Sequence, residues 1–282
     1  MFLKGQKAFA AHPEFDVVSG STRLLGFMAE HAAGDDADAQ AGLTRHVEGM
    51  YKARYAQSLT EDTTSANLLG PVLAGNLLAF SDSDVLRANF VEKGSAYLGL
   101  NGAPNKDAIG GNVLSIALEE TMRAKGGAAY GPLLKMAENG SAFEKRAALG
   151  ALSKSSDTDI ADRLRALILA EDSPLTGRQL GAILSGLLSS KAHGEATWRW
   201  LKLNFDDYVT AKVPDVRKGT MPELAGGFCS KDKRDEAASF FESKADVIPG
   251  YERSLAQVIE RIELCAALKD AKSAQLKAAL KR

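Results

Sequence analysis

Apolar side chains recur every three to four residues along most of the chain, and this spacing predicts α-helices. The pattern is clearest near the carboxyl end, where Leu255, Val258, Ile259 and Ile262 occupy positions i, i+3, i+4 and i+7. No segment shows the sustained alternation of apolar and polar residues that is typical of a half-buried strand. We therefore predict an all-α fold.

Capping residues, prolines and glycines give the expected bounds of the helices. The acidic residues 34–38 and the Gly-rich and Asn-rich residues 99–111 are predicted to be loops. Pro71 is expected in the first turn or so of its helix, and Pro249 is expected to open the last long helix. The predicted helices are 1–10 (or a connector), 22–31, 43–59, 65–80, one that starts with the Ser81-x-x-Asp84 signal and continues through Val91, 113–124, 130–138, 143–153, 157–169, 180–189, 193–212, 231–243, one from Pro249, and 273–280.

Two of these helices repeat each other's sequence signals. Ser141 with Glu144, and Thr176 with Gln179, both fit the capping box that starts a helix, and the two boxes are 35 residues apart. A period of this length with two helices per unit is typical of an α-solenoid of the HEAT or armadillo type. We predict a curved array of antiparallel helix pairs.

Composition excludes several classes of function. The chain has 35 basic and 36 acidic side chains, so it has no basic excess for binding nucleic acid. It has no apolar run of about 18 residues that could span a membrane, and residues 1–6 do not resemble a signal peptide. Cys229 and Cys265 are too few for a disulfide framework, and we expect both to be buried free thiols.

Motifs for catalysis are also missing. The sequence has no His-Glu-x-x-His zinc motif, no Walker phosphate loop and no Gly-x-Ser-x-Gly elbow. The two cysteines are 36 residues apart and have no histidine nearby, so a structural zinc site is not expected. We predict a helical scaffold without catalytic residues, metal or cofactor of its own.

One stretch carries a family resemblance through the order and spacing of its motifs. The helix 193–212 contains Trp198-Arg199-Trp200-Leu201-Lys202-Leu203-Asn204-Phe205. After it come Leu224-Ala225-Gly226-Gly227-Phe228-Cys229-Ser230, the pair Phe240-Phe241, and Glu252-Arg253-Ser254-Leu255-Ala256-Gln257. Upstream, Ser65-Ala66-Asn67-Leu68-Leu69 and Asp84-Val85-Leu86-Arg87-Ala88 add to the pattern. The chain resembles the C-terminal helical domain of zinc aminopeptidases related to aminopeptidase N and the puromycin-sensitive enzyme.

The resemblance implies a role within a larger enzyme. In such enzymes the catalytic domain holds the zinc, and the helical domain caps the active-site chamber and contacts the distal part of peptide substrates. The implied partners are the catalytic domain of the same polypeptide and peptides. We expect one helical repeat domain over residues 1–282, with 1–44 as a connector or first helices and 45–282 as the family-like region. A cytoplasmic location is favoured, with a periplasmic or secreted parent as the alternative.

The resemblance also implies substrate-facing residues. Arg217 and Lys218 lie in the segment after the Trp helix, where some family members place an arginine near the catalytic site, and Arg253 matches the family's Glu-Arg pair. The structural alternatives are exposed loop charges for the first two and an ion pair at a helix end for Arg253. We expect Trp198 and Trp200 to be core residues. A different class of function, a free-standing α-solenoid that binds a protein partner, stays open.

Overall fold

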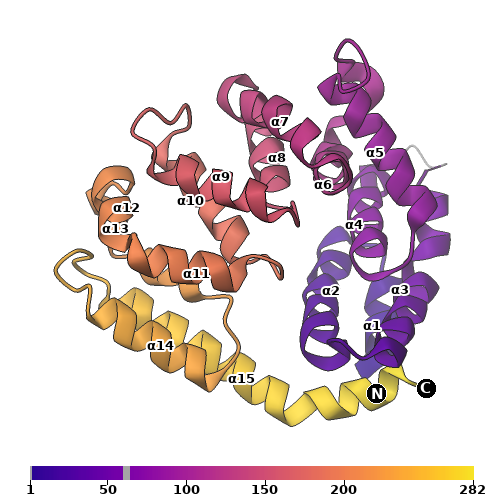
Figure 1. Ribbon diagram of the computed structural model, residues 1–282. Helices are drawn as coiled ribbons and strands as arrows, with labels where there is room; N and C mark the ends of the chain where they lie inside the picture. Colours follow the sequence, from indigo (N-terminus) through magenta and orange to yellow (C-terminus); the bar gives the residue numbers. More distant parts are fainter. Residues whose placement is uncertain (1, 60–63) are drawn as a thin grey trace. The chain divides into compact units, whose positions relative to one another are not determined.

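The computed structural model describes residues 2–59 and 64–282, and every regular element in these ranges is a helix (Figure 1). The predicted all-α fold is confirmed. Residue 1 and residues 60–63 lie outside the described ranges, and with them the first residue of the predicted helix 1–10. Helices long and apolar enough to cross a membrane are absent from the described residues.

The chain divides into two compact units. Unit 1 contains Met1–Asn89, Gly110–Ile116 and Ala267–Arg282, and unit 2 contains Phe90–Ile109 and Ala117–Ala266. Three helices contribute residues to both units: α5 (Asp84–Leu98), α6 (Leu114–Lys125) and α15 (Glu252–Leu280). The units are described separately below.

Unit 1 is built on two long helices that pack against each other, α3 and α4. Its core is mainly aliphatic and includes Leu25, Leu43, Val47, Leu73 and the fully buried Tyr51. Its other elements are shorter, and one of them is a π-helix, η1, where the sequence predicts an ordinary helix. The remaining bounds are α1 Phe2–Ala10, α2 Phe15–Phe27, η1 Met28–Ala33, α3 Ala37–Ser58, α4 Thr64–Phe80 and the 3-10 turn η3 Gly111–Val113.

Unit 2 contains the repeating part of the sequence. Both predicted capping boxes are present, at the start of α8 and of α10. Within the unit, α8 packs against α7 and α10, and α10 packs in turn against α9 and α11. The bounds are η2 Lys106–Ala108, α7 Gly127–Asn139, α8 Ala142–Leu152, α9 Thr158–Leu169, α10 Gly177–Leu188, α11 Gly194–Leu203, α12 Phe205–Lys212, α13 Asp215–Lys218, η4 Met221–Ala225 and α14 Lys231–Glu242.

Some predicted helix bounds are wrong. The single helix predicted for 193–212 is broken at Asn204, whose side-chain amide donates to the carbonyl oxygen of Trp200 at 2.7 Å. This local bond offers the backbone an alternative to a continuing helix. At the carboxyl end, two predicted helices are instead one, since 273–280 is the last part of α15. Pro71 lies inside α4 rather than in its first turn, and α15 starts after Pro249.

Candidate functional site

An aromatic cluster fixes the elements around the candidate site. Trp198 of α11 is fully buried, and its ring lies 5.2 Å from that of Phe228 and 5.4 Å from that of Phe240. Its indole Nε1 donates to Glu236 of α14 at 2.9 Å. Burial raises the pKa of the Glu236 carboxyl, but hydrogen bonds from Lys202, Lys233 and Trp198 outweigh it and lower the pKa to about 2. Trp198 is therefore a core residue, as predicted, and joins α11 to α14.

The start of α10 is locked against the end of α12. A Cβ atom at Gly177 would lie 2.2 Å from the carbonyl oxygen of Lys212, so no larger residue fits without movement of the backbone. The Lys212 ammonium donates to the carbonyl oxygen of Ala170, the C-cap residue of α9, at 2.6 Å. These contacts hold the end of α12 against both the start of α10 and the end of α9.

A pocket of about 740 Å³ lies beside this contact, entirely within unit 2. One wall is a strip of small residues on α10, and the other walls come from α12, α13 and η4. Arg178, Lys212 and Arg217 line the pocket as basic side chains, and Glu223 is the acidic one. Among the described residues, neither Arg178 nor Arg217 has an ion-pair or hydrogen-bond partner for its guanidinium.

Tyr208 forms part of the pocket wall. Its side chain is only 3% exposed, and its hydroxyl has no hydrogen-bond partner in the described part of the chain. Burial raises the pKa of this hydroxyl, so it stays protonated at neutral pH and can donate a hydrogen bond. A Cβ atom at Gly181 would lie 3.4 Å from the Tyr208 oxygen, so an alanine there would only just fit beside the hydroxyl.

The three residues predicted to face substrate lie in neighbouring segments of unit 2. Arg217 and Lys218 are in the short helix α13, where Arg217 lines the pocket and Lys218 pairs with Asp215 at 2.8 Å. Arg253 is exposed in the first turn of α15. A Cβ atom at Gly219 would lie 2.9 Å from the carbonyl oxygen of Gly250, so the end of α13 packs against the turn that leads into α15.

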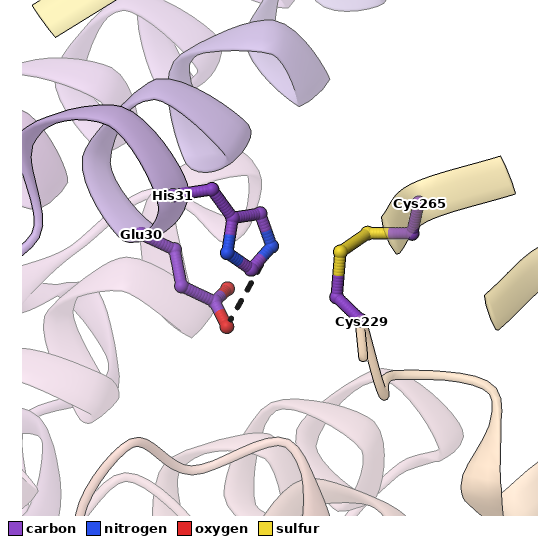
Figure 2. Close-up of a disulfide and its surroundings, with 4 residues drawn as sticks. All are labelled: Glu30, His31, Cys229 and Cys265. Atoms are coloured by element: carbon purple, nitrogen blue, oxygen red, sulfur yellow. Dashed lines mark ion pairs between the residues drawn. A yellow bond between two sulfur atoms is a disulfide. The ribbon is translucent and has the colours of Figure 1, made fainter. Parts of the chain in front are cut away.

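Cys229 and Cys265 form a disulfide, which corrects the expectation of two free thiols (Figure 2). The bond joins the segment between η4 and α14 to α15, with the two Cα atoms 5.1 Å apart. The sequence excluded a framework of several disulfides, but it could not exclude one bond between cysteines that the fold brings together. Figure 2 also shows the ion pair between Glu30 and His31 of unit 1, at 3.9 Å.

The histidines and cysteines of the described residues are distributed over both units. Within either unit taken by itself, the described residues hold no group of three His, Cys, Asp or Glu ligands. Two further histidines have other partners, since His46 is bonded to Gln6 and His193 to the carbonyl oxygen of Ser155. Cys229 and Cys265 offer no thiolate while they are joined.

The described residues thus form a helical fold with an aromatic core and a pocket lined by charged side chains. The profile of the ERAP1-like C-terminal domain family matches residues 2–264, so this chain belongs to that family. The chain is 26% identical over 225 residues to a Saccharomyces cerevisiae protein named aminopeptidase 2, mitochondrial, covering 79% of this chain and 22% of that protein. It is 31% identical over 135 residues to aminopeptidase M1-C of Oryza sativa subsp. japonica, covering 47% and 15%.

The predicted resemblance is thus confirmed, and the chain is the C-terminal domain of an aminopeptidase family. It spans about a fifth of the yeast relative's length and less of the rice relative's. The sequence reasoning missed Arg178, Tyr208 and Lys212 as pocket residues. Arg178 follows the helix-start signal Thr176 by two residues, but only the fold shows that it lines one cavity with Tyr208 and Lys212.

Proposed function

We propose that this chain is the non-catalytic C-terminal domain of a zinc aminopeptidase. In this proposal it caps the chamber in which the parent enzyme holds peptides and contacts the part of the peptide farthest from the amino end. Family membership and the names of the two relatives support the aminopeptidase context. The zinc would be held by the catalytic domain of the same polypeptide, where it would activate a water molecule and polarise the scissile carbonyl.

The observation that carries this proposal is the basic segment at α13. A peptide bound by its amino end presents a negative carboxylate at its other end, and that carboxylate needs a cationic partner if it leaves bulk water. Arg217 is exposed and its guanidinium has no partner among the described residues, so it is available for this role. Lys218, tied to Asp215, and Arg253 add positive charge to neighbouring segments.

The test is a double substitution, Arg217→Ala with Lys218→Ala, in the full-length parent enzyme. A charge-assisted hydrogen bond to a carboxylate contributes about 1–3 kcal/mol when the pair is partly desolvated. We therefore expect KM for short peptides to rise about tenfold while KM for aminoacyl anilides, which have no carboxylate, changes little. Binding lost equally from the ground state and the transition state changes KM rather than kcat.

A matched control is Lys145→Ala with Arg146→Ala, which removes an adjacent basic pair from α8 of the same unit. It should leave the ratio of the two KM values unchanged. Equal effects of the α13 double variant on peptides and anilides, or no effect at all, would contradict a role in holding the distal end of the substrate. An upstream reading frame without a zinc motif would favour the alternative, a free-standing protein-interaction module.

A further inference from the structure

The pocket of unit 2 is lined by hydrogen-bond donors that the protein itself does not fully engage. Its volume of about 740 Å³ lies within the range of small-molecule sites, which is about 300–1,000 Å³. Its strongest hydrogen-bond donors come from three elements: Arg178 on α10, Tyr208 and Lys212 on α12, and Arg217 on α13.

Three of these donors are not engaged by the protein. The guanidinium groups of Arg178 and Arg217 and the hydroxyl of Tyr208 have no partner among the described residues. Tyr208 is the most informative of the three, because the residue as a whole is buried in the fold while it also lines the pocket. An unengaged hydroxyl held in place by a buried ring and opening onto a pocket is ready to donate a hydrogen bond to a ligand.

The charges of the pocket indicate what kind of ligand this is. Three basic side chains and one acidic side chain, Glu223, give a net charge of +2. A single carboxylate is satisfied by one bidentate arginine and would leave the second guanidinium unpaired. A phosphomonoester carries a charge of about −1.5 to −2 at neutral pH and presents three strong acceptor oxygens, which two guanidinium groups and a hydroxyl can share.

We propose that this pocket binds a small phosphomonoester, with the phosphoryl group between Arg178, Arg217 and the Tyr208 hydroxyl. The organic part of the ligand lies against the apolar side of the pocket, which Val213, Met221 and Leu224 line. The site belongs to this chain alone and needs no catalytic domain. It shares Arg217 with the proposed function, which concerns a singly charged peptide carboxylate in the full-length enzyme, but it can be tested on this chain alone.

The test is calorimetric titration of the isolated chain with phenyl phosphate, and with phenyl sulfate and benzoate as singly charged probes of similar size. We expect one molecule of phenyl phosphate to bind per chain, at least tenfold more tightly than either singly charged probe. Its affinity should increase as pH rises through about 6, where the phosphoryl group takes its second charge. Phenyl sulfate should show no such increase.

Two variants locate the site and one adjusts its charge. Arg178→Ala should weaken phenyl phosphate binding by at least tenfold, as expected for loss of a charge-assisted hydrogen bond. Tyr208→Phe removes only the hydroxyl and should weaken binding several-fold, while Glu223→Gln should strengthen it. The double variant Lys145→Ala with Arg146→Ala should leave the affinity unchanged.

Far-ultraviolet circular dichroism shows whether each variant is folded. If Arg178→Ala does not fold, the predicted increase in affinity of Glu223→Gln still tests the location of the site. Absence of phenyl phosphate binding at millimolar concentration would overturn the proposal. So would an affinity unaffected by both pocket variants. Tighter binding of benzoate would also overturn it and would assign the pocket to a carboxylate, leaving the proposed function intact.

Discussion

Unit 1 holds its part of α15 with ion pairs and close backbone packing, whereas unit 2 holds its part with a covalent bond and an apolar stripe. In unit 1, Lys277 and Lys281 both pair with Asp36, at 2.9 and 2.7 Å, and Leu280 lies against Gly42 of α3. In unit 2, Cys265 is joined to Cys229, and Leu255, Val258 and Ile262 are buried. The attachment of α15 therefore depends on ion pairs in unit 1. In unit 2 it depends on the disulfide and on buried apolar side chains.

The two cores also differ in composition. The buried cluster of unit 1 is mainly aliphatic, whereas unit 2 contains a network of aromatic rings around Trp198, Phe205, Phe240 and Phe241. Aromatic side chains bury more area each, so a few residues carry a larger share of the stability of that region. The variants below separate the two arrangements, and they run from the largest expected effect to the smallest.

Truncation of the aromatic core should have the largest effect. Trp198→Ala removes a side chain with no exposed surface, and it also takes away a hydrogen-bond donor to Glu236. We expect the free energy of unfolding to fall by about 3–5 kcal/mol, measured by urea denaturation followed by circular dichroism. As a control, Trp200→Ala, at a partly exposed position of the same helix, should cost clearly less. Equal losses for the two tryptophans would show that the cluster is not the centre of the core.

Loss of the disulfide should come next. The bond closes a segment of 36 residues, and Cys229→Ser with Cys265→Ser restores the freedom of that segment in the unfolded state. We expect a loss of about 3–4 kcal/mol. Denaturation of the unmodified chain with and without a dithiol reductant gives an independent measurement. If the reductant has no effect on the denaturation midpoint while the thiols become titratable, the bond does not stabilise this unit.

The helices of unit 2 could largely be predicted from the sequence, but the pocket that they form could not. The two capping boxes were predicted correctly because each is a local arrangement of four residues, and the order and spacing of several motifs indicated the family. The break at Asn204 was missed because the helical spacing of apolar residues continues through it. One of those apolar residues, Leu203, is in fact 86% exposed and does not pack in the core. The disulfide and the meeting of Arg178 with Tyr208 depend on segments about 30 or more residues apart. A local sequence pattern cannot show which residues that are far apart in the sequence come together in the fold.

A glycine pair on α3 tests the packing of unit 1. A Cβ atom at Gly42 would lie 1.8 Å from the carbonyl oxygen of Leu280, whereas a Cβ atom at Gly49 would meet nothing within 4 Å. Gly42→Ala should therefore destabilise the chain by about 1–3 kcal/mol through forced separation of α3 and α15. Gly49→Ala should stabilise it by about 0.5–1 kcal/mol, because alanine favours the helix. Both are measured by urea denaturation, and a neutral or stabilising Gly42→Ala would contradict the close packing.

The smallest effect concerns Glu144, which joins the loop after α5 to the start of α8. It accepts hydrogen bonds from the Lys106 ammonium at 2.7 Å, the backbone amide of Ser141 at 2.9 Å and the Tyr97 hydroxyl at 2.8 Å. These bonds, with that from Lys106 the strongest, lower the pKa of Glu144 from 4.5 to about 2. Because the pKa is lower in the folded state, the stabilisation is complete above pH 4.5 and is lost as pH falls towards 2.

Glu144→Gln removes this charge and keeps a residue that can complete the capping box. We expect it to lower the free energy of unfolding by about 1–2 kcal/mol at pH 7, where the carboxylate is charged in both states. The difference between the two proteins should shrink as pH falls from 4.5 towards 2, because the unmodified glutamic acid then becomes neutral as well. Urea denaturation at several pH values measures this convergence. A difference that stays constant over this range would mean that Glu144 stabilises α8 by shape and neutral hydrogen bonding, and that its negative charge contributes nothing.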